Sequence, residues 1–376
     1  MSQTSDIIVV GLGAMGSAAL YHLARAGVRV VGFDKFTPPH SYGSTHGLSR
    51  IIREAYYEHP LYVPLVQRAY ELWAELESAS GRTLFRRTSG LMIGPRDGAL
   101  VGGARRSAAE HSLRAEELSA SDVGKRFPAF RVPAKMVALL EPRAGVLDPE
   151  SCVDTHLILA RRAGADLHTD EPVLRWRGDA GTIGVTTTKG DFVSRRLVLC
   201  AGAWTPALVD DDTIPLRVER QVMHWFTPRR HPELFTPERM PIAMIEYAPE
   251  RFFYTLPDSG AGVKVALHHE GLNTDPEHVD RRITAVDVDR VSELVRQFLP
   301  HAAGALRHSA TCLYTNTPDY HFLIDAHPRH NDVLVVSACS GHGFKFASAI
   351  GEIVADLMTD KSPRFNLRPF AFGARH

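Results

Sequence analysis

The chain has 376 residues, more than the roughly 250 to 300 over which one hydrophobic core usually grows, so we expect two domains. Its 43 basic residues balance its 43 acidic residues, which excludes the strongly basic surface of a nucleic-acid-binding protein and an attraction to anionic membranes. A small molecule is therefore the expected partner.

The four cysteines, Cys152, Cys200, Cys312 and Cys339, have no CxxC spacing and are too scattered for a disulfide framework or a zinc cluster. We therefore expect no metal site. Only a short polar stretch precedes the apolar run at Ile7, which leaves no room for a signal peptide, and no apolar run approaches the roughly 20 residues of a transmembrane helix. These features predict a cytoplasmic protein.

The first elements of the chain form a predicted βαβ unit. Residues 6–11 are a continuous β-branched run suited to a buried parallel strand, and a GxGxxG turn, Gly11, Gly13 and Gly16, follows directly. Helical spacing continues to residue 25, and a second strand over residues 28–34 ends in an acid, Asp34. This context makes the glycine pattern a strong signal for dinucleotide binding.

Later elements alternate between two types of architecture. Hydrophobic spacing predicts helices over residues 54–76, 152–164, 287–299 and 344–358. Apolar runs predict strands over residues 89–94, 136–141, 192–200, 252–256, 263–267 and 332–337, with a turn at 145–149. We expect residues 1–85, 145–214 and 310–376 to form a discontinuous nucleotide-binding domain, and residues 86–144 and 215–309 an inserted antiparallel substrate domain.

Each glycine of the GxGxxG turn, and the acid that follows the second strand, has a distinct physical role. Gly11 permits the tight turn, Gly13 lets a pyrophosphate approach the backbone, and Gly16 allows the helix to pack closely on the strand, while Asp34 accepts from a ribose hydroxyl. A glycine-rich turn in a non-binding α/β fold is the alternative. The fingerprint does not separate NAD from FAD, but the chain contains no second GxGxxG, and Gly202 fits a close approach to the same dinucleotide.

Three segments of the chain resemble the family of monomeric sarcosine oxidase and N-methyltryptophan oxidase: GSTHGLSRIIR at 43–53, TCLYTNTPD at 311–319 and SGHGFKF at 340–346. The resemblance runs essentially end to end. It implies an α/β fold like that of glutathione reductase and D-amino-acid oxidase, with a Rossmann-type FAD-binding domain and an inserted antiparallel sheet. It also implies a monomer that oxidises an N-methyl or cyclic secondary amino acid and reduces O2 to hydrogen peroxide.

The same resemblance assigns the cofactor contacts. FAD is expected to be bonded covalently through its 8α-methyl group to Cys312, which composition alone would make an inert buried thiol like the other three. Arg50 is expected to lie over the flavin. The turn before the helix near residue 344 could stabilise negative charge on a reduced flavin, or could be merely a tight turn. The remaining expected contacts are Lys35, Ser44, His46, Ser49, Val173, Gly202, Gly341, Gly343 and Phe344.

Lys264 and Lys345 are the only two of the seven lysines that lie within apolar runs, and a buried lysine is costly without a partner. By resemblance, Lys264 lies near flavin N5 and promotes the reaction with oxygen, while Arg53 and Lys345 bind the substrate carboxylate. Period-two alternation places Lys264 and His268 on one face of their strand, although a strand with one solvated face shows the same pattern. Arg50 and Arg53 would share a helix face if their segment is helical.

The remaining pocket residues also come from the resemblance. Tyr254 and His268 are expected to act beside Lys264 and Arg50 in catalysis, and Tyr314 and Met244 to wall the substrate. His269 is the alternative to His268, because a register error of one residue would exchange them.

Two departures from the family pattern leave the substrate open. Leu48 and Ser49 stand where the family has an acid and a threonine, and Tyr57 with His59 and Pro60 replaces a glycine-rich stretch. Sarcosine, N-methyltryptophan, pipecolate and proline-like rings all remain candidates. Three other functions stay open: a flavin dehydrogenase that passes electrons to a quinone or carrier protein, an NAD-dependent oxidoreductase, and a nucleotide-binding protein without enzymatic activity.

Overall fold

The computed structural model describes residues 3–179, 181–209, 211 and 213–372. One sheet has six strands in the order β10 (Asp166–His168), β3 (Val30–Phe33), β2 (Ile7–Val10), β14 (Arg196–Leu199), β22 (His330–Ser337) and β21 (Leu323–His327). All neighbours are parallel except β21, which is antiparallel to β22. The predicted βαβ unit therefore lies at the centre of a mixed α/β sheet.

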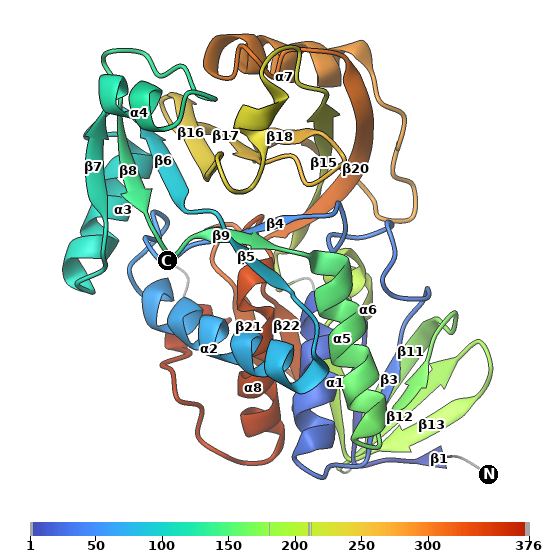
Figure 1. The fold of residues 1–376 in the computed structure, drawn as a ribbon. Helices are drawn as coiled ribbons and strands as arrows, with labels where there is room; N and C mark the ends of the chain where they lie inside the picture. Colours follow the sequence, from blue (N-terminus) through green and yellow to red (C-terminus); the bar gives the residue numbers. More distant parts are fainter. Residues whose placement is uncertain (1–2, 180, 210, 212, 373–376) are drawn as a thin grey trace.

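Helices cover one face of this six-stranded sheet, and a smaller sheet covers the other (Figure 1). The helices are α1 (Ala14–Arg25), α2 (Tyr62–Ser80), α5 (Pro149–Arg162) and α8 (Ala347–Met358), whose apolar side chains share one buried cluster with the sheet. The smaller sheet has the order β1 (Gln3–Thr4), β13 (Asp191–Ser194), β12 (Thr182–Thr187) and β11 (Val173–Asp179). Burial on both faces explains why the strands of the six-stranded sheet are continuous apolar runs.

A nine-stranded sheet forms the upper half of the molecule in Figure 1. Its path is β19 (Leu272–Asn273), β15 (Arg217–Phe226), β18 (Val263–His268), β17 (Arg251–Leu256), β16 (Ile242–Ala248), β6 (Gly90–Gly94), β8 (Val137–Glu141) and β7 (Glu116–Ser119), with β20 (Leu306–Asn316) paired to β15. Helices α3 (Ala99–Glu110), α4 (Ala120–Arg126) and α7 (Ala285–Phe298) accompany it. The predicted antiparallel region is confirmed except for one parallel pair, β6 with β16.

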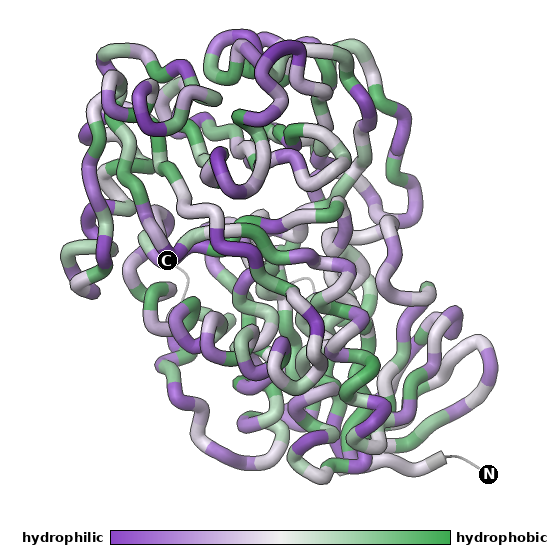
Figure 2. The backbone as a smooth tube through the Cα atoms, viewed as in Figure 1, coloured by the Kyte–Doolittle hydropathy of each residue, from purple (hydrophilic) through white to green (hydrophobic). Residues whose placement is uncertain are grey.

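A small sheet lies between these two bodies (Figure 1) and consists of β4 (Arg50–Ile52), β9 (Gly145–Leu147) and β5 (Phe85–Arg87). The remaining short elements are α6 (Thr205–Val209) and the 3₁₀ turns η1 (Gly202–Trp204), η2 (Pro232–Phe235), η3 (Phe344–Phe346) and η4 (Arg368–Phe370). Figure 2 shows the hydrophobic stretches along the inner strands and helices and the hydrophilic ones on the outer loops. Within the described residues, no helix has the length and apolar character needed to cross a bilayer.

Several predicted boundaries were wrong. The helix expected over residues 54–76 begins only at Tyr62, because Pro60 disfavours helical backbone at the residue before it. Arg50 consequently lies in a strand, so Arg50 and Arg53 share no helix face. The turn expected at 145–149 is strand β9, where a side chain on Gly145 would meet the Arg86 carbonyl oxygen at 2.2 Å. That glycine serves close strand pairing rather than a turn.

Other predicted elements differ from the structure in where they begin or in being split into two elements. The strand expected over 192–200 is two strands in different sheets, β13 and β14, with Arg195 between them. Both parts are buried, so hydrophobicity alone could not reveal the change of sheet. Helix α5 begins at Pro149, and the Asp148 side chain caps it by accepting from the backbone N–H of Ser151 at 2.9 Å. The helix expected from residue 344 begins with the 3₁₀ turn η3 before α8.

Candidate active site

A cavity of about 460 Å³ lies between the six-stranded and nine-stranded sheets. The carboxyl ends of the parallel strands β2, β14 and β22 line one side of it, and side chains from β15, β16, β17, β18 and β20 line the other. Ligands of open α/β sheets bind at this edge of the parallel strands. The volume falls within the range of small-molecule and cofactor sites.

The glycine-rich turn forms one end of the cavity. Gly11 has a left-handed φ of 88°, and a Cβ there would lie 2.6 Å from the carbonyl oxygen of Cys200. A Cβ on Gly16 would lie 1.7 Å from the Gly11 carbonyl oxygen, which is the close helix contact that this glycine permits. Asp34 accepts from the Leu12 N–H at 2.7 Å and from the Phe36 N–H at 2.9 Å, and it borders the cavity. The turn and its acid are thus held in the arrangement expected for a dinucleotide.

Unpartnered polar atoms and open glycine positions indicate where a dinucleotide would lie. The Ser44 and Ser337 hydroxyls border the cavity and are buried without a hydrogen-bond partner among the described residues. Gly202 also borders it, with a φ of 55°, and a Cβ there would meet no atom within 4 Å. Because buried hydroxyls are normally hydrogen-bonded, a bound polar molecule such as FAD fits these atoms.

An ion pair between Lys35 and Glu277 borders the cavity. Lys35 Nζ lies 2.5 and 2.7 Å from the two carboxylate oxygens of Glu277, and Trp204 Nε1 donates to the same carboxylate at 2.8 Å. Arg281 Nη2 donates to the Tyr42 carbonyl oxygen at 2.7 Å. The segment between β19 and α7, the loop descending at the right of Figure 1, is thereby joined to the loop after β3. No sequence motif identified Glu277.

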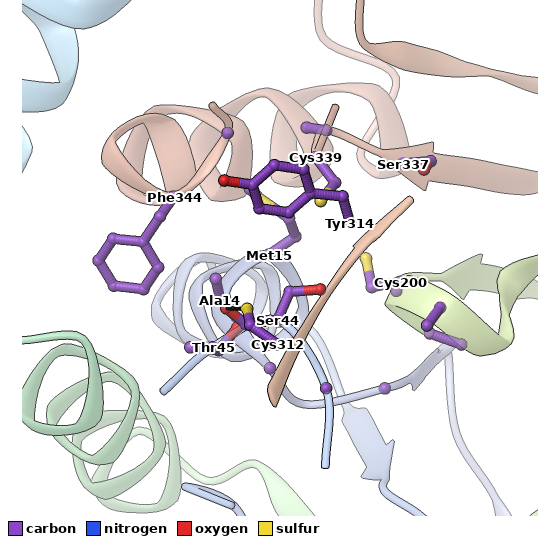
Figure 3. Close-up of a pocket in the computed structure, with 18 of the residues that line it drawn as sticks. Ala14, Met15, Ser44, Thr45, Cys200, Cys312, Tyr314, Ser337, Cys339 and Phe344 are labelled. Carbon is purple, nitrogen blue, oxygen red and sulfur yellow. Dashed lines mark hydrogen bonds between the residues drawn. The ribbon is translucent and has the colours of Figure 1, made fainter. Parts of the chain in front are cut away.

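Cys312 lies on β20 beside Ser44 (Figure 3). Its Sγ is 3.7 Å from Arg50 Nη2 and 3.7 Å from the Ser44 carbonyl oxygen. Burial raises the pKa of the Cys312 thiol, and the positive charge of Arg50 opposes that rise. Cys200 borders the same cavity, but burial raises its pKa to about 12. Cys312 is therefore the cavity thiol with a guanidinium against its sulfur.

Lys264 lies behind the cavity rather than on its wall. Its Nζ donates to the carbonyl oxygens of Gly47 and Ser49, both at 2.8 Å, and lies 5.3 Å from the centre of the Trp225 ring. Burial lowers its pKa well below 10.5, and the charge of Arg50 lowers it further. Both Lys264 and its neighbour Val265 are buried, so the alternative of a strand with one solvated face is wrong.

The end of the cavity opposite the glycine turn carries two buried cations. Arg53, only 1% exposed, makes two bonds to the Glu58 carboxylate, at 2.7 and 2.9 Å. Lys345 Nζ donates to the His342 carbonyl oxygen at 2.6 Å. Burial lowers the pKa of Lys345 to about 7, and the charge of Arg53 acts in the same direction. Arg53, Glu58 and Lys345 all border the cavity, although nothing in the sequence indicated Glu58.

The remaining predicted pocket residues border the same cavity. Met244, Tyr254, Tyr314 and His268 border the cavity, and His268 Nδ1 lies 3.3 Å from the Tyr314 hydroxyl. Burial lowers the pKa of His268 well below 6.5, so its ring is neutral. His269 turns away with a φ of 58° and lies 3.7 Å from Glu219. The structure therefore places His268, and not His269, on the cavity wall.

The cavity brings together most of the residues expected to contact cofactor and substrate. Gly13, Lys35, Ser49, Arg50, Val173, Gly341, Gly343 and Phe344 line it beside those described above. His46, like Gly16 and Lys264, lies behind the wall; burial lowers its pKa to about 3, and its Nε2 has no partner among the described residues. The described chain contains no group of three or more His, Cys, Asp or Glu side chains arranged to hold a metal ion.

Gly341 lies against two ring side chains of the cavity wall, Tyr314 and His268. Its φ is 73°, and a Cβ there would lie 2.7 Å from Tyr314 and 2.9 Å from His268. We expect Gly341→Ala to displace both rings and to raise the KM for substrate about tenfold, in addition to a strain of about 1 to 2 kcal/mol. Melting temperature and steady-state kinetics measure the two effects separately.

Gly164 offers the matched control. Its φ of 95° imposes similar strain, but a Cβ there would meet no atom within 4 Å. Gly164→Ala should lower the melting temperature without changing KM. Equal KM values in the two variants would show that Gly341 does not shape the pocket.

The chain is similar in sequence and in fold to known oxidoreductases. A sequence model described as FAD dependent oxidoreductase matches residues 6–357. Monomeric sarcosine oxidase from Streptomyces avermitilis is 44% identical over 361 residues, which is 95% of this chain and 94% of the relative. N-methyl-L-tryptophan oxidase from Salmonella heidelberg is 36% identical, with 97% of each chain covered. Among solved structures, NikD, an amino acid oxidase essential for nikkomycin biosynthesis, superposes with a TM-score of 0.86 at 25% identity, with 98% of each chain covered.

Proposed function

Since the chain belongs to the family of FAD-dependent oxidoreductases, we propose that it oxidises a small N-methyl or cyclic secondary amino acid to an imine and reduces O2 to hydrogen peroxide. One observation carries the proposal: the buried pair Arg53 and Lys345 lies on the same cavity as the glycine turn. A carboxylate held by this pair would place the neighbouring amine inside a cavity that fits a dinucleotide. For sarcosine, hydrolysis of the imine gives glycine and formaldehyde.

FAD, when bound, supplies the two-electron acceptor for the C–H bond next to nitrogen. Gly11, Gly13 and Asp34 would hold its adenosine diphosphate part, and Gly341, Gly343 and Phe344 would supply backbone N–H groups to its ring. The chain is an FAD-dependent oxidoreductase, and its own residues have two tasks: to bind the carboxylate and to hold the amine neutral.

Carboxylate binding begins with an exchange of partners. Arg53 already pairs with Glu58, whose pKa is lowered by the Arg53 charge against the effect of burial, so Glu58 is ionised near neutral pH. Both bonds to Glu58 come from Arg53 Nη2, so a substrate carboxylate can take the place of Glu58 at that nitrogen and gains Lys345 as a second cation. The Glu58 carboxylate thus neutralises the positive charge of the buried Arg53 until a substrate carboxylate takes its place.

The amine is held by neutral groups. The neutral His268 ring and the Tyr314 hydroxyl are hydrogen-bonding partners beside it, and Tyr254 and Met244 provide contact surface. Arg53 and Lys345 disfavour a third positive charge nearby, which lowers the pKa of the bound amine. The neutral amine, with its lone pair free, is the reactive form.

Two further assignments belong to this proposal. Cys312 would carry the flavin covalently, supported by Arg50 against its sulfur. Lys264 would stabilise negative charge that develops on oxygen: burial holds its pKa well below 10.5, and a negative charge arriving beside it would favour its protonated form. The two-domain division, a monomeric state and a cytoplasmic location remain predictions, to be tested by limited proteolysis, gel filtration and fractionation.

A panel of secondary amino acids tests the function. Purified enzyme is incubated with sarcosine, N-methyltryptophan, pipecolate and proline, and both hydrogen peroxide and the carbonyl product are measured. We expect one peroxide per substrate consumed for at least one member of the panel. Substrate consumption that requires a quinone and yields no peroxide would favour a dehydrogenase.

The pKa of Lys345 predicts a pH dependence of anion binding. Protonated Lys345 attracts a carboxylate and neutral Lys345 does not, so affinity is full below pH 7 and falls as the pH rises through about 7. A carboxylate without an amine, such as methoxyacetate, isolates this titration from that of the substrate amine. We expect its Kd, measured from the flavin absorbance, to rise about tenfold from pH 6 to pH 9. A constant Kd would exclude Lys345 from the anion site.

A further inference from the structure

Tyr56 contacts both Arg53 and Lys345, the two basic side chains proposed to bind the substrate carboxylate. It is fully buried, and the guanidinium carbon of Arg53 lies 4.3 Å from the centre of its ring. Its hydroxyl accepts from Lys345 Nζ at 3.2 Å and lies 2.7 Å from His342 Nδ1. One side chain thus forms the support beneath Arg53 and a hydrogen-bond partner of Lys345. No sequence motif singled it out.

His342 fixes the direction of these hydrogen bonds. Its Nε2 lies 3.0 Å from the Tyr320 carbonyl oxygen, which can only accept, so Nε2 carries the hydrogen. Burial lowers the pKa of His342 to about 3, so the ring is neutral and its Nδ1 is an acceptor. The Tyr56 hydroxyl therefore donates to Nδ1 at 2.7 Å, the nearer of its two acceptors, the other being the His342 carbonyl oxygen at 3.3 Å. Its oxygen is left to accept from Lys345. The His342 carbonyl accepts a second hydrogen from Lys345, at 2.6 Å.

We propose that Tyr56 is the positioning residue of the substrate carboxylate subsite: its ring supports Arg53, and its hydroxyl, oriented by His342, directs Lys345 into the cavity. This inference rests on the proposed function, because it takes Arg53 and Lys345 as the groups that bind the substrate. Two of the three ammonium hydrogens of Lys345 are used by Tyr56 and His342. The third is then available to a carboxylate. Because the two existing contacts already hold the lysine side chain, it loses little further conformational entropy when a carboxylate binds.

Tyr56→Phe tests the hydroxyl while it retains the ring beneath Arg53. The change leaves Lys345 with one acceptor fewer and removes the donor to His342 Nδ1. In the holoenzyme, methoxyacetate should bind about tenfold more weakly, and the KM for substrate should rise by a similar factor. The value of kcat at saturating substrate and the rate of reoxidation by oxygen should stay within twofold, because the bound substrate still has Arg53 and Lys345 as its carboxylate partners.

Tyr70→Phe is the matched control. Tyr70 is also buried, donates its hydroxyl to the Arg143 carbonyl oxygen at 3.0 Å, and has the Arg143 guanidinium 4.8 Å from its ring centre, but it does not border the cavity. This variant loses a comparable hydroxyl and should keep the wild-type affinity for methoxyacetate. A positioning role predicts that only Tyr56→Phe changes the affinity.

The outcomes separate this inference from the proposed function. The inference is overturned if Tyr56→Phe binds methoxyacetate with wild-type affinity, or if Tyr56→Phe and Tyr70→Phe lose the same affinity. Either result leaves the proposed function intact. Failure of the wild-type holoenzyme both to bind methoxyacetate and to oxidise any secondary amino acid would overturn the two together.

Discussion

Replacement of Lys264 by methionine should slow the reoxidation of the reduced enzyme by oxygen about 100-fold and leave its reduction by substrate nearly unchanged. An electrostatic contact that acts on developing charge in a buried place typically contributes a factor of this size. Lys264 is only 1% exposed and is held by two carbonyl oxygens, so its charge, once formed, is weakly screened by solvent. Stopped-flow absorbance measures the two half-reactions separately.

Two further variants separate charge from structure. Lys264→Gln retains a hydrogen-bond donor for the carbonyl oxygens of Gly47 and Ser49 without the charge, and should slow reoxidation as Lys264→Met does. Lys189→Met removes an exposed lysine charge and should change neither half-reaction. Equal slowing of both half-reactions in the Lys264 variants would contradict a specific role in the oxygen reaction.

Cys312→Ala should convert a flavin that stays with the acid-denatured polypeptide into one that is released completely. The sulfur of Cys312 lies against Arg50, whose charge favours the thiolate that covalent attachment requires. The variant should still bind FAD, because the glycine turn, Asp34 and the surrounding polar atoms do not depend on the sulfur. Acid precipitation followed by absorbance of pellet and supernatant measures the covalent fraction.

The cavity provides matched controls for this experiment, because Cys200 and Cys339 also border it. Cys200→Ala and Cys339→Ala should leave the colour in the pellet. A colourless wild-type pellet would exclude a covalent link. Release of flavin from Cys339→Ala but not from Cys312→Ala would show that the flavin is bonded to Cys339 and not to Cys312.

The sequence predicted the features that depend on local patterns. The βαβ unit follows from a β-branched run, three glycines and an acid, and the parallel sheet contains it as expected. The antiparallel sheet follows from alternating runs such as residues 263–267. Motif resemblance then selected residues from distant parts of the chain, and strands such as β18 and β20 bring most of these residues to one cavity.

Residues whose role arises from tertiary contact were not predictable. Glu58 and Tyr56 follow Arg53 in a loop with no periodicity, and only the fold brings Lys345 to them from nearly 300 residues away. Glu277 meets Lys35 across 242 positions. Lys264 was predicted to lie near the flavin, but its bonds to two backbone carbonyl oxygens could not be read from the sequence. A single sequence contains no local signal for such pairs.

Anaerobic mixing of the yellow enzyme with a secondary amino acid tests whether this cavity oxidises such substrates. We expect at least one of sarcosine, N-methyltryptophan, pipecolate or proline to bleach the flavin absorbance without oxygen. We also expect air to restore the colour with one hydrogen peroxide per flavin. Flavin that remains oxidised with every member of the panel at saturating concentration would contradict the assignment of this cavity to secondary amino acid oxidation.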